Sequence, residues 1–184
     1  MRTLVIETAT SSCSVALFDG DAVVAHDSAI VGRGHAERLM PMIAALPGGG
    51  RADTIRVDCG PGSFTGIRVG IAAARGLGFG WGVDVRGFSS LALIAAHWFA
   101  HAPDAAVTVV IDGGHGEKFV QSFVRDRLDA PTALQSLPAA DVVITGPVAG
   151  ETPPDARHAM LLGDHVLPVR PIYGRAPDAK PMAA

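Results

Sequence analysis

The sequence predicts a two-lobed α/β protein, and three observations support this. Apolar residues make up 48% of the 184 residues and charged residues only 18%, so the chain can fill a sizeable core. Strand and helix patterns follow one another in the order βββ-α-β-α-β-α up to residue 102. Ala102-Pro103-Asp104 interrupts this series, and a strand–turn–strand pattern begins again after it. We therefore expect one lobe at residues 1–102 and a smaller lobe with an extended tail at residues 103–184.

The first lobe opens with the pattern of an antiparallel meander. Its hydroxyl-rich first turn spans residues 7–12, and Asp19-Gly20-Asp21 forms the second turn. The apolar helix that follows ends at the glycine-rich stretch 47–50 and carries Leu39, Met40, Ile43 and Leu46 at helical spacing. The expected strands of this lobe are 3–6, 13–18, 22–30, 54–58 and 83–86, and the expected helices are 35–46, 63–80 and 89–101.

The helix after the Gly60-Pro61-Gly62 turn has an unusual composition. Small residues recur at every fourth position and form a seam with almost no side chains, made of Gly66, Gly70, Ala74 and Gly78. Each interior glycine costs an exposed helix about 1 kcal/mol relative to alanine, so the seam indicates that another backbone comes close. That backbone belongs either to the chain's own sheet or to a partner protein.

The second lobe has weaker patterns. Strands are expected at 107–111, 118–124 and 141–145, and the first two are joined by a turn that contains Asp112-Gly113-Gly114. Residues 159–162 fit a strand or a short helix. From Pro168 onward the chain is rich in proline, which favours an extended tail.

Charge and cysteine content narrow the classes of function. The net charge of −3 gives no basic footprint for tight binding of nucleic acid by this chain alone. Two lone thiols, Cys13 and Cys59, fit a reducing cytoplasm better than a disulfide scaffold. An acidic residue at position 7 comes too early for a signal peptide, and apolar runs such as Leu91–Ala96 are far shorter than the roughly 20 residues of a membrane span. We expect a soluble cytoplasmic protein.

Two hairpin turns form the candidate site for a phosphate or nucleotide. They would face one cleft with residues Thr8, Ser11 and Ser12 on one side and Asp112, Gly113 and Gly114 on the other. The alternative is that both are ordinary turns. The Gly60–Gly66 loop lacks the lysine of a Walker loop and the spacing of a dinucleotide fingerprint, although the helix after it could hold an anion.

The sequence gives little support for a serine-hydrolase site or a metal site. Gly62-Ser63-Phe64-Thr65-Gly66 is not the Gly-x-Ser-x-Gly elbow of serine hydrolases. His97 and His101 have the spacing of metal ligands on a helix, but the glutamate of the zinc-protease motif is missing, and a pair of surface histidines explains them equally well. We expect no catalytic residue and no metal site.

Four segments resemble the TsaB family, also called YeaZ, the small bacterial partners of the tRNA threonylcarbamoyladenosine transferase TsaD. The Gly60–Gly70 stretch resembles the most specific signature of the family. The other three segments are the opening hairpin Leu4–Leu17, the helix start His35–Pro41 and the tail Pro171–Asp178.

The resemblance implies the ASKHA fold, the two-lobed arrangement of actin-like ATPases, with a shortened second lobe. It also implies a non-catalytic subunit, because Ser90 and Ile94 stand where TsaD carries its two metal-binding histidines. Glu7 stands where the family usually has aspartate, which weakens a magnesium role there. The chain itself would need no cofactor, since ATP and magnesium are used by its partners.

The function implied is to pair with TsaD for threonylcarbamoyl transfer to the adenosine flanking the anticodon of ANN-decoding tRNAs. The ATPase TsaE would join the complex, tRNA would be reached only through the complex, and the chain alone would form a homodimer. The expected partner interface comprises His35, Leu39, Ile43, Phe64, Ile67, Gly70, Ile71, Ala74 and Arg75. The alternative is an ATP-binding ASKHA-class enzyme that acts alone; the old glycoprotease label of the wider family has no catalytic group here to support it.

Overall fold

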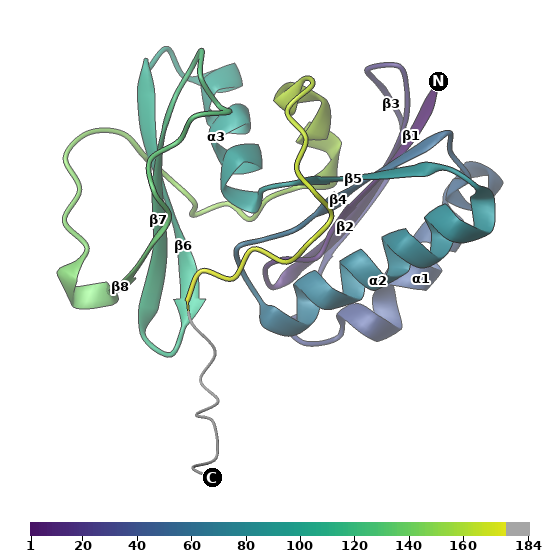
Figure 1. Cartoon of the computed structure of the whole chain (residues 1–184), viewed down its shortest axis with the longest axis horizontal. Coiled ribbons are helices and arrows are strands. Elements are labelled where there is room, and N and C mark those ends of the chain that lie inside the picture. The colour runs from purple at the N-terminus through teal and green to yellow at the C-terminus, as the bar shows by residue number, and fades with distance from the viewer. Residues whose placement is uncertain (176–184) are drawn as a thin grey trace, which may run out of the picture.

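The first sheet contains the five strands that the sequence predicts within residues 1–102. A computed structural model describes residues 1–175 and places five strands in the order β3-β2-β1-β4-β5 (Figure 1). The first three strands are antiparallel, and β4 and β5 run parallel to β1. The strands are β1 (Arg2–Glu7), β2 (Ser12–Asp19), β3 (Ala22–Ile30), β4 (Thr54–Asp58) and β5 (Asp84–Phe88).

Two helices, α1 (His35–Ala45) and α2 (Phe64–Trp81), cover one face of this sheet (Figure 1). α2 begins where predicted because the Ser63 hydroxyl accepts a hydrogen bond of 3.2 Å from the N–H of Gly66. It ends at Gly82, whose φ of 69° is a left-handed conformation that favours glycine. A short 3-10 helix, η1 (Pro47–Gly50), follows α1. Apolar side chains fill the core between these helices and the sheet. Among them are Leu4, Ile6, Leu39, Ile43, Val57, Ile67 and Ile71.

The small-residue seam of α2 faces the chain's own sheet. A Cβ atom on Gly66 would lie 2.1 Å from the carbonyl oxygen of Thr8, and one on Gly78 would lie 2.4 Å from the Val85 side chain. Of the two explanations for the seam, the structure therefore selects the chain's own strands. Because the sheet already occupies this side of α2, the seam has no room for a partner.

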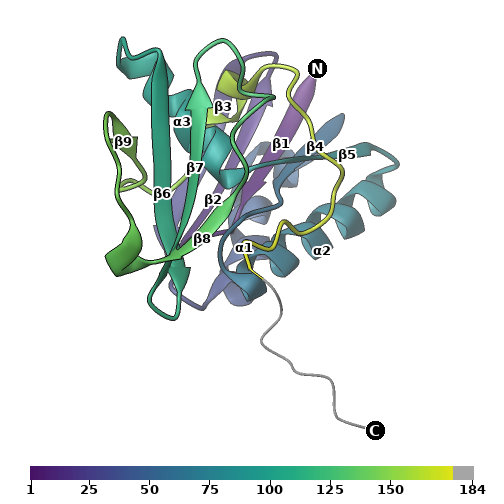
Figure 2. The same cartoon turned by 60° about the vertical axis from the view of Figure 1, so that its left-hand side comes forward.

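α3 (Ser90–His101) packs on the opposite face of the first sheet, where it also contacts a second sheet (Figure 2). The second sheet has the order β8-β7-β6-β9. Its strands are β6 (Ala106–Gly114), β7 (Glu117–Val124), β8 (Gln135–Pro138) and β9 (Val148–Ala149). One apolar core joins the two sheets through α3, with Phe18 on one side and Phe123 on the other. The predicted lobe boundary at residues 102 and 103 falls between α3 and β6, and as a domain boundary it stays a prediction.

The second half of the chain departs from the predicted elements in two places. The strand expected at 141–145 is wrong: only the 3-10 helix η2 (Ala139–Asp141) overlaps it, and Val143 is 87% exposed, so no sheet covers this segment. The short strand β8, which the sequence did not indicate, takes the edge beside β7 instead. Residues 159–162 belong to the 3-10 helix η3 (Ala156–Leu162).

Buried Arg56 of β4 fixes η3 and the segment after it to the first sheet. Its guanidinium donates hydrogen bonds of 3.1 Å to the carbonyl oxygens of both Ala159 and His165. None of the described helices has the length and hydrophobicity that crossing a bilayer would require.

We predict that Gly66→Ala destabilises the protein while Gly76→Ala on the same helix stabilises it. The added Cβ at position 66 meets backbone, which cannot move aside cheaply, so the free energy of unfolding should fall by about 2 kcal/mol. No atom lies within 4 Å of a Cβ at Gly76, so the higher helix propensity of alanine should raise it by up to about 1 kcal/mol. Urea denaturation followed by circular dichroism measures both, and equal effects at the two positions would contradict the packing described here.

Candidate functional site

The first hairpin turn is fastened to the start of α2. The Thr8 hydroxyl donates a hydrogen bond of 2.8 Å to the carbonyl oxygen of Gly66. The N–H of Ser63 donates one of 2.6 Å to the carbonyl oxygen of Ala9. The Thr8 hydroxyl proton is thus already used inside the protein, which leaves Ser11 as the exposed hydroxyl of the turn.

His35 holds the same turn from the side of α1. Its Nε2 lies 2.9 Å from the carbonyl oxygen of Thr10 and 3.1 Å from that of Ser12. Since both neighbours are acceptors, Nε2 carries the proton and donates to them. With only 1% of its surface exposed, His35 anchors the turn, and its assignment to a partner interface is corrected.

Contacts within the β6–β7 hairpin hold the second turn in place. The carboxylate of Asp112 accepts a hydrogen bond of 3.1 Å from the N–H of Gly114 and lies 4.0 Å from the Lys118 ammonium. Gly113 has little free space, because an added Cβ would lie 3.2 Å from both the Glu117 carbonyl oxygen and the Phe119 ring.

The segment from Pro168 to Arg175 links the first lobe to this second turn. The N–H of Ile172 donates a hydrogen bond of 2.7 Å to the carbonyl oxygen of Cys59. The Arg175 guanidinium lies 2.6 Å from the Nδ1 atom of His115 and 4.0 Å from the Glu117 carboxylate. Both predicted walls of the nucleotide cleft therefore contact other parts of the chain, and nucleotide binding there stays a prediction. Residues 176–178 of the tail motif lie outside the described residues.

Two buried carboxyl groups, Glu7 and Asp58, lie at the ends of neighbouring strands β1 and β4. One oxygen of Asp58 accepts hydrogen bonds from the N–H of Gly60 at 2.7 Å and from the Ser90 hydroxyl at 2.8 Å. Its other oxygen is buried and has no hydrogen-bond partner among residues 1–175. Glu7 accepts hydrogen bonds from the N–H of Ala9 at 2.8 Å and from the Ser14 hydroxyl at 3.1 Å.

Burial makes this pair hold protons more tightly than free carboxyl groups. It raises the pKa of Asp58 to about 7, in spite of the hydrogen bonds from Gly60 and Ser90 that lower it. It also raises the pKa of Glu7 well above its usual range, and the neighbouring charge of Asp58 raises it further. Asp58 is not among the functional residues predicted from the sequence, although a carboxylate between an apolar strand and a Gly-Pro-Gly turn is a visible signal.

Ser90 and Ile94, the positions where the resemblance would place the metal-binding histidines of TsaD, have structural roles here. The Ser90 hydroxyl donates to Asp58, and Ile94 is 6% exposed within the apolar core. Within residues 1–175, no group of three histidine, cysteine, aspartate or glutamate side chains is arranged to hold a metal ion.

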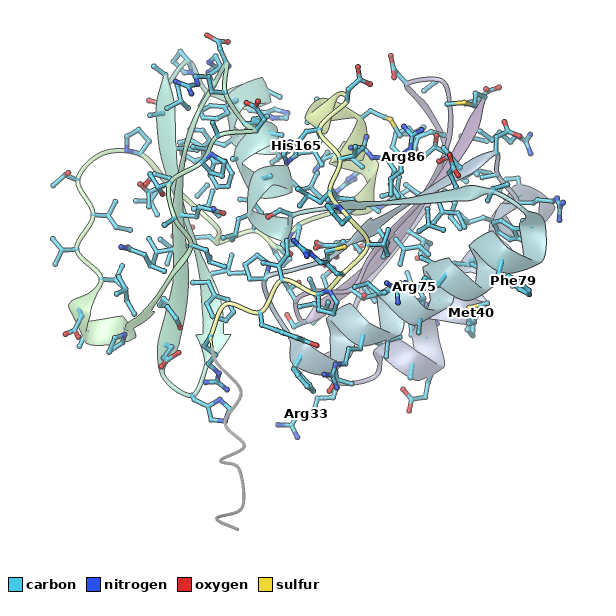
Figure 3. The ribbon with its side chains drawn as sticks, viewed as in Figure 1. Arg33, Met40, Arg75, Phe79, Arg86 and His165 are labelled. Carbon is cyan, nitrogen blue, oxygen red and sulfur yellow. The ribbon has the colours of Figure 1, made fainter. Side chains whose placement is uncertain are left out.

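Most residues expected at the partner interface lie inside the protein. Phe64, at 55% exposure, and Arg75 are on the surface. The others are covered by the chain's own sheet and cannot contact a partner in this fold, which corrects the assignment of Leu39, Ile43, Ile67, Gly70, Ile71 and Ala74. The outward side of the same helices carries other apolar residues, notably Met40 and Phe79 (Figure 3).

Comparison with known proteins gives consistent matches. A family model described as TsaD, tRNA N6-adenosine threonylcarbamoyltransferase, matches residues 28–143. The tRNA threonylcarbamoyladenosine biosynthesis protein TsaB of Escherichia coli is 37% identical over 131 residues, which is 68% of this chain and 56% of that protein. The chain thus matches only about half the length of this relative. An uncharacterized protein of Mycobacterium tuberculosis is 31% identical and aligns over 98% of this chain and 94% of its own length.

The fold matches a solved structure over nearly the whole chain. YeaZ from Pseudomonas aeruginosa superposes with a TM-score of 0.80, covering 94% of this chain and 99% of that one at 22% sequence identity. The ASKHA-type α/β fold predicted from the sequence is therefore confirmed.

We predict that Asp58→Asn weakens the pH dependence of stability. A carboxyl group whose pKa is raised by folding binds its proton more tightly in the folded state, so stability is lost as pH rises from the unfolded pKa to the folded one. The free energy of unfolding should therefore fall by about 1 to 3 kcal/mol between about pH 5 and about pH 8. Asparagine keeps an acceptor for Gly60 and Ser90 but has no proton to lose, so its slope should be smaller.

The control is Asp21→Asn, which removes an exposed carboxyl group of the β2–β3 turn. Urea titrations at several pH values measure the slopes. If Asp58→Asn and Asp21→Asn both leave the slope of the unsubstituted protein unchanged, the buried pair does not hold a proton.

Proposed function

The chain belongs to the TsaB (YeaZ) family, and we propose that it acts there as a non-catalytic subunit. In this role it pairs with TsaD and supports threonylcarbamoyl transfer to the adenosine flanking the anticodon of ANN-decoding tRNAs. The observation that carries the proposal is an exposed apolar surface on α1 and α2, the two helices that bear the family signature.

The match to TsaB supports the pathway, and the site chemistry supports the non-catalytic role. The E. coli relative is named for tRNA threonylcarbamoyladenosine biosynthesis. The family model that matches is that of the transferase itself, so the chain shares its fold. The Ser90 hydroxyl, however, is occupied with Asp58, and the Ile94 side chain lies in the core. Two positions that bind metal in the transferase thus serve packing and hydrogen bonding here.

The outward side of α1 and α2, which we call the helix face, carries large exposed apolar residues beside the charged residues of both helices. Phe79 is 93% exposed and Met40 is 44% exposed, and both project away from the sheet (Figure 3). Small exposed residues separate them, so another helix can approach closely. These residues are Ala44, Ala72, Gly76 and Gly80. An apolar surface of this kind favours a protein partner over open solvent.

The two charged residues of α2 contact the C-terminal segment of the described chain. The guanidinium of Arg68 lies 3.6 Å from the centre of the Phe64 ring and donates a hydrogen bond of 3.0 Å to the Tyr173 hydroxyl. Arg75 donates to the carbonyl oxygen of Val169. Both guanidinium groups are thus engaged within the chain itself.

The helix face also explains the expected homodimer, and the other partners follow from the complex with TsaD. Without TsaD, a second copy of the chain covers the helix face, which gives a homodimer. TsaE joins after the TsaD pair has formed, and tRNA is reached through the complex. The two free, buried cysteines fit a cytoplasmic location.

We predict that Phe79→Asp weakens binding to TsaD by at least about tenfold. The substitution puts a charge at the most exposed apolar position of the helix face, where pairing would bury it. Isothermal titration calorimetry with purified TsaD measures the affinity. The melting temperature should stay unchanged, because Phe79 makes little contact with its own chain.

Val143→Asp is the matched control, since Val143 is 87% exposed but lies between η2 and β9, far along the chain from the helix face. It should bind TsaD normally. Normal binding by Phe79→Asp, or equal loss in both variants, would reject the helix face as the interface.

The alternative, an ATP-binding enzyme that acts alone, makes a different prediction. It requires saturable binding of Mg-ATP between the two hairpin turns. We expect no binding heat in a calorimetric titration of the isolated chain up to about millimolar Mg-ATP, because Thr8 and Asp112 are already hydrogen-bonded within the protein. Saturable binding that Ser11→Ala or Asp112→Ala abolishes would favour the enzyme.

A further inference from the structure

A cavity of about 370 Å³ lies between the second half of α3 and the segment at 148–158. It is on the opposite side of the first sheet from the helix face, so the proposed function does not use it. Its volume falls in the range of small-molecule sites and is too large for a bare metal ion. Apolar side chains form much of its wall, among them Leu93, Ile94 and Pro154.

Three histidines from two distant segments form one side of this cavity. The His97 ring stacks on the His158 ring with centroids 3.9 Å apart. The centroid of the His101 ring lies 4.4 Å from that of the His97 ring. The Nδ1 atom of His101 donates a hydrogen bond of 2.8 Å to the carbonyl oxygen of His97. The Nδ1 atom of His97 is buried and has no hydrogen-bond partner within the described residues.

Burial disfavours the charged form of two of these imidazoles. It lowers the pKa of His158 to about 4, and the neighbouring His97 lowers it further. It also lowers the pKa of His97, and the neighbouring His101 lowers it further. A neutral imidazole offers a lone pair on one nitrogen, so His97 and His158 add hydrogen-bond acceptors and no positive charge to this side of the cavity.

The charged side chains that line the cavity are both carboxylates, Glu151 and Asp155. Asp155 is held by His26 at 2.8 Å and by Arg157 at 3.2 Å. Glu151 is exposed. On the α3 side, Trp98 donates its indole N–H to Asp104 at 3.0 Å, which fixes the ring in the wall. The lining therefore combines carboxylates, ring nitrogens that accept hydrogen bonds and an aromatic ring.

We propose that this cavity binds a small organic cation, an amine attached to an apolar body. The carboxylate of Glu151 attracts the ammonium group, whose N–H groups hydrogen-bond to the imidazole nitrogens. The Trp98 ring adds a cation–π contact, and the apolar wall accepts the body of the ligand.

The test is a titration of the full chain with benzylamine, followed by NMR of the two tryptophan indole N–H signals. Trp98 lines the cavity and Trp81 does not, so Trp81→Phe assigns the signals. Benzyl alcohol and benzoate have nearly the same shape without the positive charge. We expect benzylamine to shift the Trp98 signal saturably. Benzyl alcohol should bind with an affinity at least about fivefold lower.

Glu151→Gln should weaken benzylamine binding about threefold to fivefold, and His97→Phe should weaken it further by removing the unpartnered acceptor. Glu37→Gln removes an exposed carboxylate on α1 and should leave the affinity unchanged. Equal binding of the amine, the alcohol and the acid would overturn the proposal, as would tighter binding of benzoate. If Ni²⁺ shifts the Trp98 signal and benzylamine does not, the cavity is a metal site, and this result would also overturn the proposal.

Discussion

The close contact between the start of α2 and the first hairpin turn is the constraint on which the fold depends. Gly62 and Gly66 have no side chains, and a Cβ at either position would lie about 2 Å from a backbone oxygen of the turn, at 1.9 Å and 2.1 Å respectively. That absence lets Thr8 hydrogen-bond to Gly66 and lets Ser63 hydrogen-bond to Ala9. The turn is thereby fixed against the helix, and the carboxyl ends of β1 and β4 are closed off from solvent.

This contact also decides which surfaces remain for other molecules. Because the inner side of α2 is covered by the sheet, only its outward side is left for a partner, and Phe79 is exposed there, as is Met40 on the neighbouring helix α1. The closed strand ends also bury Glu7 and Asp58, whose carboxyl groups accept hydrogen bonds from the protein's own N–H and hydroxyl groups.

The sequence predicted the first lobe well because each of its elements has a clear local signal. The strand at Thr54–Asp58, for example, is apolar and is stopped by Gly60-Pro61-Gly62. The inward and outward sides of α2 were harder to assign, because a helix that is apolar nearly all round gives no clear direction. The second lobe was predicted less well: β8 has only four residues, and the apolar run at 141–145 turned out to be largely exposed. The cluster of His97, His101 and His158 joins segments that no local pattern connects.

The most direct test of the central claim is tRNA modification in a reconstituted system with and without this chain. The reaction contains TsaD, TsaE, the enzyme that makes threonylcarbamoyl-AMP and an ANN-decoding tRNA. The account predicts that modification requires the chain, that Phe79→Asp reduces it, and that the chain alone transfers nothing. Full modification without the chain, or transfer by the chain alone, would contradict its role as a non-catalytic partner.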